Sequence, residues 1–203
     1  MKNAHPVVCL AFVVVVSLCA ASEPNAIRNK LASNTTIQGI PCAKGDAWFY
    51  PDGSLNQCTL SALTTIGGYS IPRGALIELW PTGAARHLTL PHDAVLSGYR
   101  IKGGALPRSS SEENVTAFYP SGRLRSVVLA GDQTIQGVPC GAGPSILFYD
   151  SIDGSNHVDF YEDGKLQSCN LTRDFGGQRI GQRLVLPDEP KSLIPAAATA
   201  ASR

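Results

Sequence analysis

The sequence has few charged and few aromatic residues, and it has no apolar run long enough to cross a bilayer. Charged residues make up 16% of the 203 residues and aromatic residues 7%, whereas apolar residues make up 43%. An apolar fraction of that size excludes a long disordered chain. The longest apolar run, residues 7–21, is about 15 residues long, and a membrane-spanning helix needs about 20.

The sequence also lacks an excess of charge of either sign. Its formal net charge at pH 7 is +1, and no five consecutive residues carry like charges. Binding to nucleic acid or to an anionic membrane surface depends on concentrated positive charge. We therefore expect neither as a partner, and no membrane span in the mature chain.

The first 21 residues have the features of an export signal. Lys2 is their one charged residue, the apolar run follows it, and small residues near Ala21 suit cleavage by signal peptidase. Leu18 precedes Cys19, where lipidation requires a small residue, so a lipid anchor is the less favoured alternative. We expect a periplasmic or secreted protein divided into a signal peptide at 1–21, a linker at 22–35, a β-repeat domain at 36–186 and a flexible tail at 187–203.

Two glycine-containing motifs recur along the chain. The first has an aromatic residue three positions before a glycine, and the second has an apolar residue two positions before a glycine. The first motif occurs at Tyr50/Gly53, Trp80/Gly83, Tyr119/Gly122 and Tyr161/Gly164, and the second at Ile37/Gly39, Ile66/Gly68, Leu96/Gly98 and Ile135/Gly137. From Gly53 to Gly68, as in the two following units, the spacing is 15 residues. This regularity predicts four units of about 30 residues.

Apolar residues alternate on both sides of the first-motif glycine. They stand four and six positions before it, and five and seven positions after it. A period of two is typical of a strand with one buried face. The apolar residue two positions after the glycine, such as Leu55, breaks the alternation and predicts a β-bulge beside the turn. Because no ten-residue stretch has a helical apolar stripe, we expect an all-β array of short antiparallel hairpins, with three strands in each unit.

The third and fourth units are longer than the others in the same segment. Gly98 and Gly122 are 24 residues apart and Gly137 and Gly164 are 27 apart, against 14 and 15 in the first two units. The extra residues, around 105–113 and 150–156, are rich in turn formers. Insertions at one position of a repeat tend to project from one side, which is often the binding side.

The residues at 49–55, Phe-Tyr-Pro-Asp-Gly-Ser-Leu, and at 118–124, Phe-Tyr-Pro-Ser-Gly-Arg-Leu, resemble the signature of MORN-type repeats. The likeness is to the variant of bacterial exported proteins and covers residues 36–186. It implies an elongated or curled sheet of hairpins that serves for binding or as a scaffold, with no catalytic residues to carry over. The units here are longer than is usual for that family, and they contain paired cysteines.

The histidines do not form a recognisable metal or catalytic site. His87 is expected on the solvent-facing side of a strand, and its spacing from His92 does not place both rings on one face. His157 is near Asp150 and Asp153, so the choice there is between a solvated turn and a calcium site.

Other catalytic patterns are equally weak. There is no G-x-S-x-G motif, and Asp52 and Asp163 occupy a turn position. We therefore expect no enzyme and no cofactor, and a noncatalytic interaction or structural module whose partner is a protein or glycan of the envelope or secreted fraction. One alternative is a secreted hydrolase with its site in the insertions at 103–114 and 150–157.

A second alternative is a carbohydrate-binding module. Its binding face would consist of aromatic rings aligned across the units: Trp48, Tyr50, Trp80, Tyr119 and Tyr161. The same rings could instead pack between neighbouring hairpins.

Four of the six cysteines lie outside the export signal. Cys42 and Cys140 stand three positions after a second-motif glycine, and Cys58 and Cys169 stand five positions after a first-motif glycine. Units one and four contain both cysteine positions, whereas units two and three contain neither. Joint presence predicts disulfides within units, Cys42–Cys58 and Cys140–Cys169. Bonds between units one and four are the alternative, because in a simple meander the first and third strands are too far apart.

Overall fold

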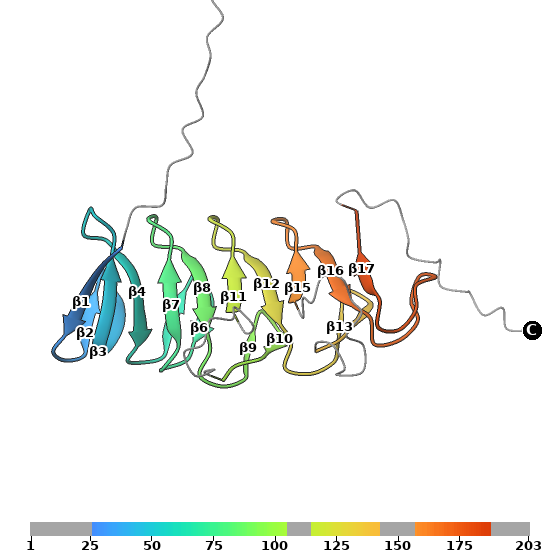
Figure 1. Ribbon diagram of the computed structural model, residues 1–203, viewed down its shortest axis with the longest axis horizontal. Helices are drawn as coiled ribbons and strands as arrows, with labels where there is room; N and C mark the ends of the chain where they lie inside the picture. The colour runs from blue at the N-terminus through green and yellow to red at the C-terminus, as the bar shows by residue number, and fades with distance from the viewer. Residues whose placement is uncertain (1–25, 105–114, 143–156, 188–203) are drawn as a thin grey trace, which may run out of the picture.

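The computed structural model describes residues 26–104, 115–142 and 157–187, and all regular structure in them is β-strand. One sheet has eleven strands, and three further sheets have two strands each. Figure 1 shows the hairpins following one another along the long axis of the molecule, in the order of the sequence. The predicted all-β class is confirmed.

The main sheet is antiparallel throughout and contains four long hairpins between two edge strands. In spatial order its strands are β1 (Ile27–Leu31), β3 (Ile40–Phe49), β4 (Leu55–Leu60), β7 (Leu76–Leu79), β8 (Ala85–Thr89), β11 (Val115–Phe118), β12 (Leu124–Val128), β15 (His157–Phe160), β16 (Leu166–Asn170) and β17 (Arg183–Val185). The eleventh strand, β2 (Thr35–Ile37), pairs with the start of β3.

A short hairpin precedes each long one. Units two to four therefore have four strands each, and the expectation of three is wrong for them, whereas the first unit has three strands because β3 belongs to both of its hairpins. The short hairpins are β2 with the start of β3, β5 (Thr64–Ile66) with β6 (Tyr69–Ile71), β9 (Ala94–Leu96) with β10 (Tyr99–Ile101), and β13 (Gln133–Ile135) with β14 (Val138–Cys140). Their turns need two consecutive residues with positive φ, as at Gln136 (50°) and Gly137 (86°). The second glycine motif therefore marks the turn of a short hairpin. The strands of this hairpin are too short to show an apolar alternation of their own.

The predicted bulge occurs at the same place in all four long hairpins. Glu78 faces His87 across β7 and β8, but the next residue, Leu79, faces Ala85, so Arg86 is the extra residue. A bulge places two successive residues against one on the partner strand and changes the alternation beyond it. Ala85 and Leu88 can therefore both point into the core although an odd number of positions separates them.

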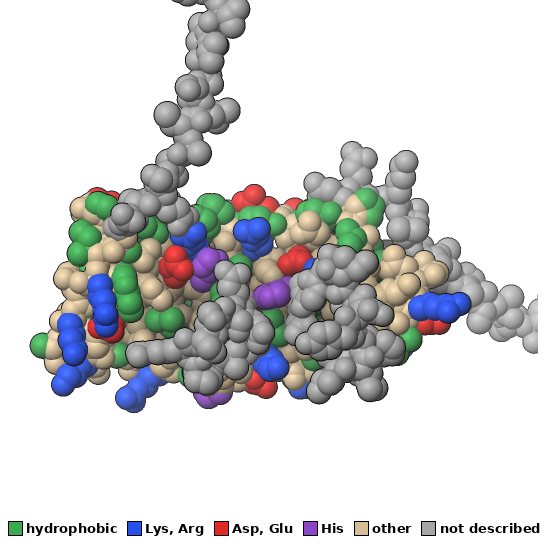
Figure 2. Space-filling view, viewed as in Figure 1, with side chains coloured by type: hydrophobic (Ala, Val, Ile, Leu, Met, Phe, Trp, Pro, Cys, Tyr) green, Lys and Arg blue, Asp and Glu red, His purple; other side chains and the backbone are tan. Residues whose placement is uncertain are grey.

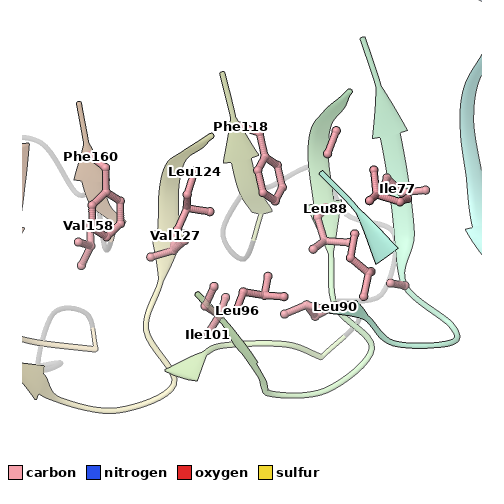
Figure 3. Close-up of a cluster of buried hydrophobic side chains, with 14 of the residues drawn as sticks. Ile77, Leu88, Leu90, Leu96, Ile101, Phe118, Leu124, Val127, Val158 and Phe160 are labelled. Atoms are coloured by element: carbon pink, nitrogen blue, oxygen red, sulfur yellow. The ribbon is translucent and has the colours of Figure 1, made fainter. Parts of the chain in front are cut away.

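The core lies between the main sheet and the short hairpins. Ile77, Leu88 and Val127 of the main sheet are fully buried, as is Ile101 of β10. Figure 3 shows these side chains in one cluster with Leu96 of β9. One face of the main sheet is thus covered, and its other face carries the residues that remain accessible to solvent.

Both predicted disulfides are present, and the pairing between units is excluded. The Cα atoms are 5.7 Å apart in Cys42–Cys58 and 5.6 Å apart in Cys140–Cys169. In a simple meander Cys42 and Cys58 would be separated by an intervening strand. Because β3 continues from the short hairpin into the long one, Cys42 instead lies directly beside β4.

The sheet begins earlier than the sequence predicts. β1 and the first residue of β2 lie within residues 22–35, which were expected to be a linker, and β1 pairs with β3 along its whole length. The predicted export signal at 1–21, all but the first residue of the predicted tail at 187–203, and most of both insertions lie outside the described residues. Within the described ranges, no helix has the length and apolar character of a membrane span.

Candidate functional site

A groove of about 500 Å³ lies on the solvent-accessible face of the main sheet. It crosses the strands from β4 to β15, and its volume is in the range of ligand-binding pockets. The lining residues are Gln57, Leu76, Glu78, His87, Thr89, Val115, Ala117, Arg125, Ser126, His157 and Asp159. Figure 2 shows acidic, basic and histidine side chains gathered over the middle of this face.

Six of the lining residues form one row across adjacent strands. Strand register places Gln57 opposite Glu78, Glu78 opposite His87, His87 opposite Ala117, Ala117 opposite Ser126, and Ser126 opposite Asp159. Neighbouring strands are about 4.8 Å apart, so the row is roughly 24 Å long. The small side chain of Ala117 lies between His87 and Ser126 in this row.

Near one end of the row, Glu78 binds two basic side chains. Its Oε2 atom is 3.0 Å from His87 Nδ1, and its Oε1 atom is 3.2 Å from Arg86 Nη1. The hydrogen bond with His87 lowers the pKa of the Glu78 carboxyl, partial burial opposes this, and the positive charges of His87 and Arg86 lower the pKa further. Glu78 is therefore held as a carboxylate and is unsuited to act as a general acid near neutral pH.

At the other end, Asp159 is the centre of a hydrogen-bond network. It accepts hydrogen bonds from the hydroxyls of Ser126 and Ser168, each at 2.8 Å, and it forms an ion pair with Arg183. Arg183 also donates to the carbonyl oxygen of His157 at 3.0 Å and to Ser168 Oγ at 2.7 Å. Such a network fixes side chains from three hairpin strands and from edge strand β17.

The group of Ser126, His157 and Asp159 does not have the geometry of a catalytic triad. His157 Nδ1 is 3.1 Å from Ser126 Oγ, but the Ser126 hydroxyl donates to Asp159. In a triad the histidine takes the proton of the serine, and the carboxylate binds the other ring nitrogen. Here the carboxylate accepts from the serine and not from the histidine, so the three residues are not arranged as a triad.

The aromatic residues considered as a binding face are outside the lining of the groove. Tyr50 is 6% exposed, and its hydroxyl donates to the carbonyl oxygen of Leu79 in the next long hairpin. The hydroxyl of Tyr119 makes the corresponding bond to Phe160 in β15, and that of Tyr161 bonds to Leu186, the residue after β17. These contacts agree with the alternative in which the rings pack between neighbouring hairpins.

The two tryptophans have arginine neighbours. The Arg28 guanidinium lies 5.8 Å from the centre of the Trp48 ring, and that of Arg86 lies 4.7 Å from the centre of the Trp80 ring. Trp48 is in strand β3. Trp80 is in a turn segment, at the position that a tyrosine occupies in each of the other three units. The five rings therefore do not form one continuous face.

The remaining candidates lie apart from one another. His92 is in an exposed connection, and Asp52 accepts hydrogen bonds from the amide and hydroxyl of Ser54, which lower the pKa of its carboxyl. Asp150 and Asp153 lie outside the described residues. Among the residues the structure describes, no three His, Cys, Asp or Glu side chains are placed to hold a metal ion.

No family model, curated protein or solved structure matches this chain. The resemblance to MORN-type repeats stays a prediction from the sequence.

Sequence reasoning missed Ser126 and Asp159 as residues of one site. The repeat alignment places Ser126 four positions after a first-motif glycine and Asp159 five positions before the next, both on the outward side of their strands. That signal was present in the spacing. Their contact depends on which strands of successive hairpins are neighbours, and the alignment does not contain this information.

Proposed function

We propose that this chain is an exported, noncatalytic protein-binding module that holds its partner on the open face of the main sheet. The observation that carries the proposal is the groove over β7, β8, β11 and β12, where fixed polar side chains flank a small residue, Ala117. The apolar side chains Leu76 and Val115 line the same groove and supply surface for a peptide segment. Apolar lining with a few oriented polar groups is typical of binding sites.

The rigidity of the face supports a binding role. Asp159 is bound by side chains from β12, β16 and β17, and Glu78 is bound from β8. Side chains that are already ordered lose less entropy when a ligand binds. The two disulfides further constrain the first and fourth units.

A protein partner agrees better with the lining than a glycan does. Sugar rings commonly pack against aromatic side chains, and among the described residues the lining contains no Phe, Tyr or Trp. The carbohydrate-binding alternative would need the turn rings, of which Tyr50, Tyr119 and Tyr161 are hydrogen-bonded to neighbouring strands. A periplasmic or secreted location is supported by the signal-like N-terminus together with the two disulfides.

Site-specific photo-cross-linking tests this proposal. A benzophenone side chain is placed at Gln57 or Thr89, which line the groove, and the protein is exposed to the envelope and secreted fractions of its source cells. Leu63 is 69% exposed and is not part of the groove, so it is the matched control position. We expect one discrete protein adduct from the groove positions and none from Leu63. Adducts from Leu63 alone, or no adduct from either groove position, would overturn the proposal.

A further inference from the structure

Two neighbouring hairpins of the groove differ at one decisive position. In hairpin β7–β8 the bulge residue is Arg86, and the residue five positions before the turn glycine is Glu78. In hairpin β11–β12 the same two positions hold Arg125 and Ala117. The arginine is therefore present in both hairpins, whereas the carboxylate is present only in the first.

This difference decides whether the arginine has a carboxylate partner within the described residues. Arg86 forms an ion pair with Glu78, and its side chain is 19% exposed. Arg125 is exposed, and none of the described residues provides it with a carboxylate within ion-pair distance. Tyr119 is an aromatic neighbour, with its ring centre 5.9 Å from the guanidinium.

The two carboxylates in the described lining of the groove already have ion-pair partners other than Arg125. Glu78 is paired with Arg86 and His87, and Asp159 with Arg183. In the row across the sheet each stands two strands from Ala117, which is roughly 10 Å at the usual strand spacing. The centre of the groove thus combines an available guanidinium with the space left by a methyl side chain.

We propose that the groove binds a carboxylate side chain of an acidic peptide segment over Ala117, where Arg125 pairs with it as Arg86 pairs with Glu78. This inference rests on the proposed function of the open sheet face. A guanidinium forms a charge-assisted pair with a carboxylate, and the Arg86–Glu78 contact of 3.2 Å in β7–β8 is the template for the complex. Leu76 and Val115, in the same lining, contact the methylene groups of the bound Glu or Asp.

The part of the lining that the structure describes has no aromatic ring, which favours a peptide carboxylate over the carboxylate of an acidic sugar. The test therefore uses three defined probes. They are a blocked tetraglutamate peptide, a blocked tetraglutamine peptide of the same length, and tetragalacturonate as the source of sugar carboxylates. Binding to the full-length, disulfide-bonded protein is followed by amide chemical shifts in NMR titrations at low salt.

We expect tetraglutamate to shift the amide signals of Thr89, Ala117 and Ser126, and to bind more tightly than tetraglutamine. Arg125→Gln should weaken tetraglutamate binding about tenfold or more, as expected for the loss of a charged hydrogen-bond pair. Arg173 is exposed and outside the groove, so Arg173→Gln is the matched control and should leave binding unchanged.

A gain of charge inside the groove provides an independent check. Ala117→Glu should place a carboxylate beside Arg125, reproduce the Glu78–Arg86 pair and abolish tetraglutamate binding. The melting temperature should be unchanged or higher, which shows that the variant folds. Ala117→Gln adds the same volume without the charge, and it should reduce binding less than Ala117→Glu does.

The outcomes separate this inference from the proposed function. Tetraglutamate binding that is the same in the wild type and in Arg125→Gln overturns the role of Arg125. Arg125-dependent binding of tetragalacturonate, without binding of tetraglutamate, overturns the peptide assignment. If no probe shifts the groove amides while Thr89 still cross-links to a protein, the inference fails and the proposed function stands. If cross-linking from the groove also fails, both fail.

Discussion

The hydroxyl of Tyr50 donates a hydrogen bond to the carbonyl oxygen of Leu79 over 2.7 Å, and this bond joins the turn of the first long hairpin to the second. Tyr119 makes the equivalent bond to Phe160 at 2.9 Å, and Tyr161 bonds to the carbonyl of Leu186 at 2.7 Å. The turn aromatic of each of these units therefore contributes to the junction with the strand that follows it.

Removing one of these hydroxyls should destabilise the fold. We expect Tyr50→Phe to lower the free energy of unfolding by about 1–2 kcal/mol, because the buried Leu79 carbonyl loses its donor. Urea unfolding followed by fluorescence measures the change. Tyr99→Phe is the control, since the Tyr99 ring stacks on Phe160 at 5.2 Å and its hydroxyl has no hydrogen bond among the described residues. Equal losses in both variants would contradict this interpretation.

The second unit lacks the equivalent bond. Trp80 replaces the tyrosine there, and its Nε1 atom is buried without a hydrogen-bond partner in the described structure. A tyrosine at this position should reach the carbonyl of Phe118, which corresponds to Leu79 in the preceding junction. We expect Trp80→Tyr to be more stable than Trp80→Phe by about 1 kcal/mol in thermal unfolding. Two variants of equal stability would show that the junction between the second and third units has a different geometry.

The disulfide of the first unit should make a large contribution to stability. Cys42 and Cys58 are 16 positions apart, and closing a loop of that length stabilises the folded state by about 3 kcal/mol in the chain-entropy account. The double variant Cys42→Ala/Cys58→Ala should lose about this amount relative to the oxidised protein. Under reducing conditions the variant and the wild type, both then without this bond, should differ much less. A difference that persists after reduction would assign the effect to packing.

Glu78 predicts a pH dependence of stability. The pKa of Glu78 is lower in the folded protein than in the unfolded chain, chiefly because of its hydrogen bond with His87. The contribution of its ionised form is therefore fully present above the unfolded pKa of about 4.3 and is lost as the pH falls through the folded pKa.

The matched variant is Glu78→Gln. Its deficit in the free energy of unfolding relative to the wild type should narrow steadily as the pH falls below about 4.3. Urea unfolding between pH 3 and pH 7 measures both curves. A deficit that does not change across this range would mean that Glu78 acts through its shape and not through its charge.

Much of the local structure follows from the sequence because it depends on neighbours in the chain. The alternation of apolar residues identified the long hairpins, and the apolar residue two positions after each turn glycine identified the bulge. The joint presence of Cys42 with Cys58, and of Cys140 with Cys169, was enough to predict the pairing within units. Side-chain periodicity, turn geometry and loop closure are local properties, so the sequence by itself determined these features.

The short hairpins and the groove were decided by tertiary structure. Strands such as β5 and β6 have three residues each, too few for a period to be recognised, and their position over the core depends on packing against the long hairpins. Ser126 meets Asp159 because β12 pairs with β15, and Arg183 reaches Asp159 because β17 closes the sheet beside β16. Register between hairpins is a non-local property that arises from shared burial and backbone pairing, and it alone brings Glu78, Arg125 and Asp159 into one groove.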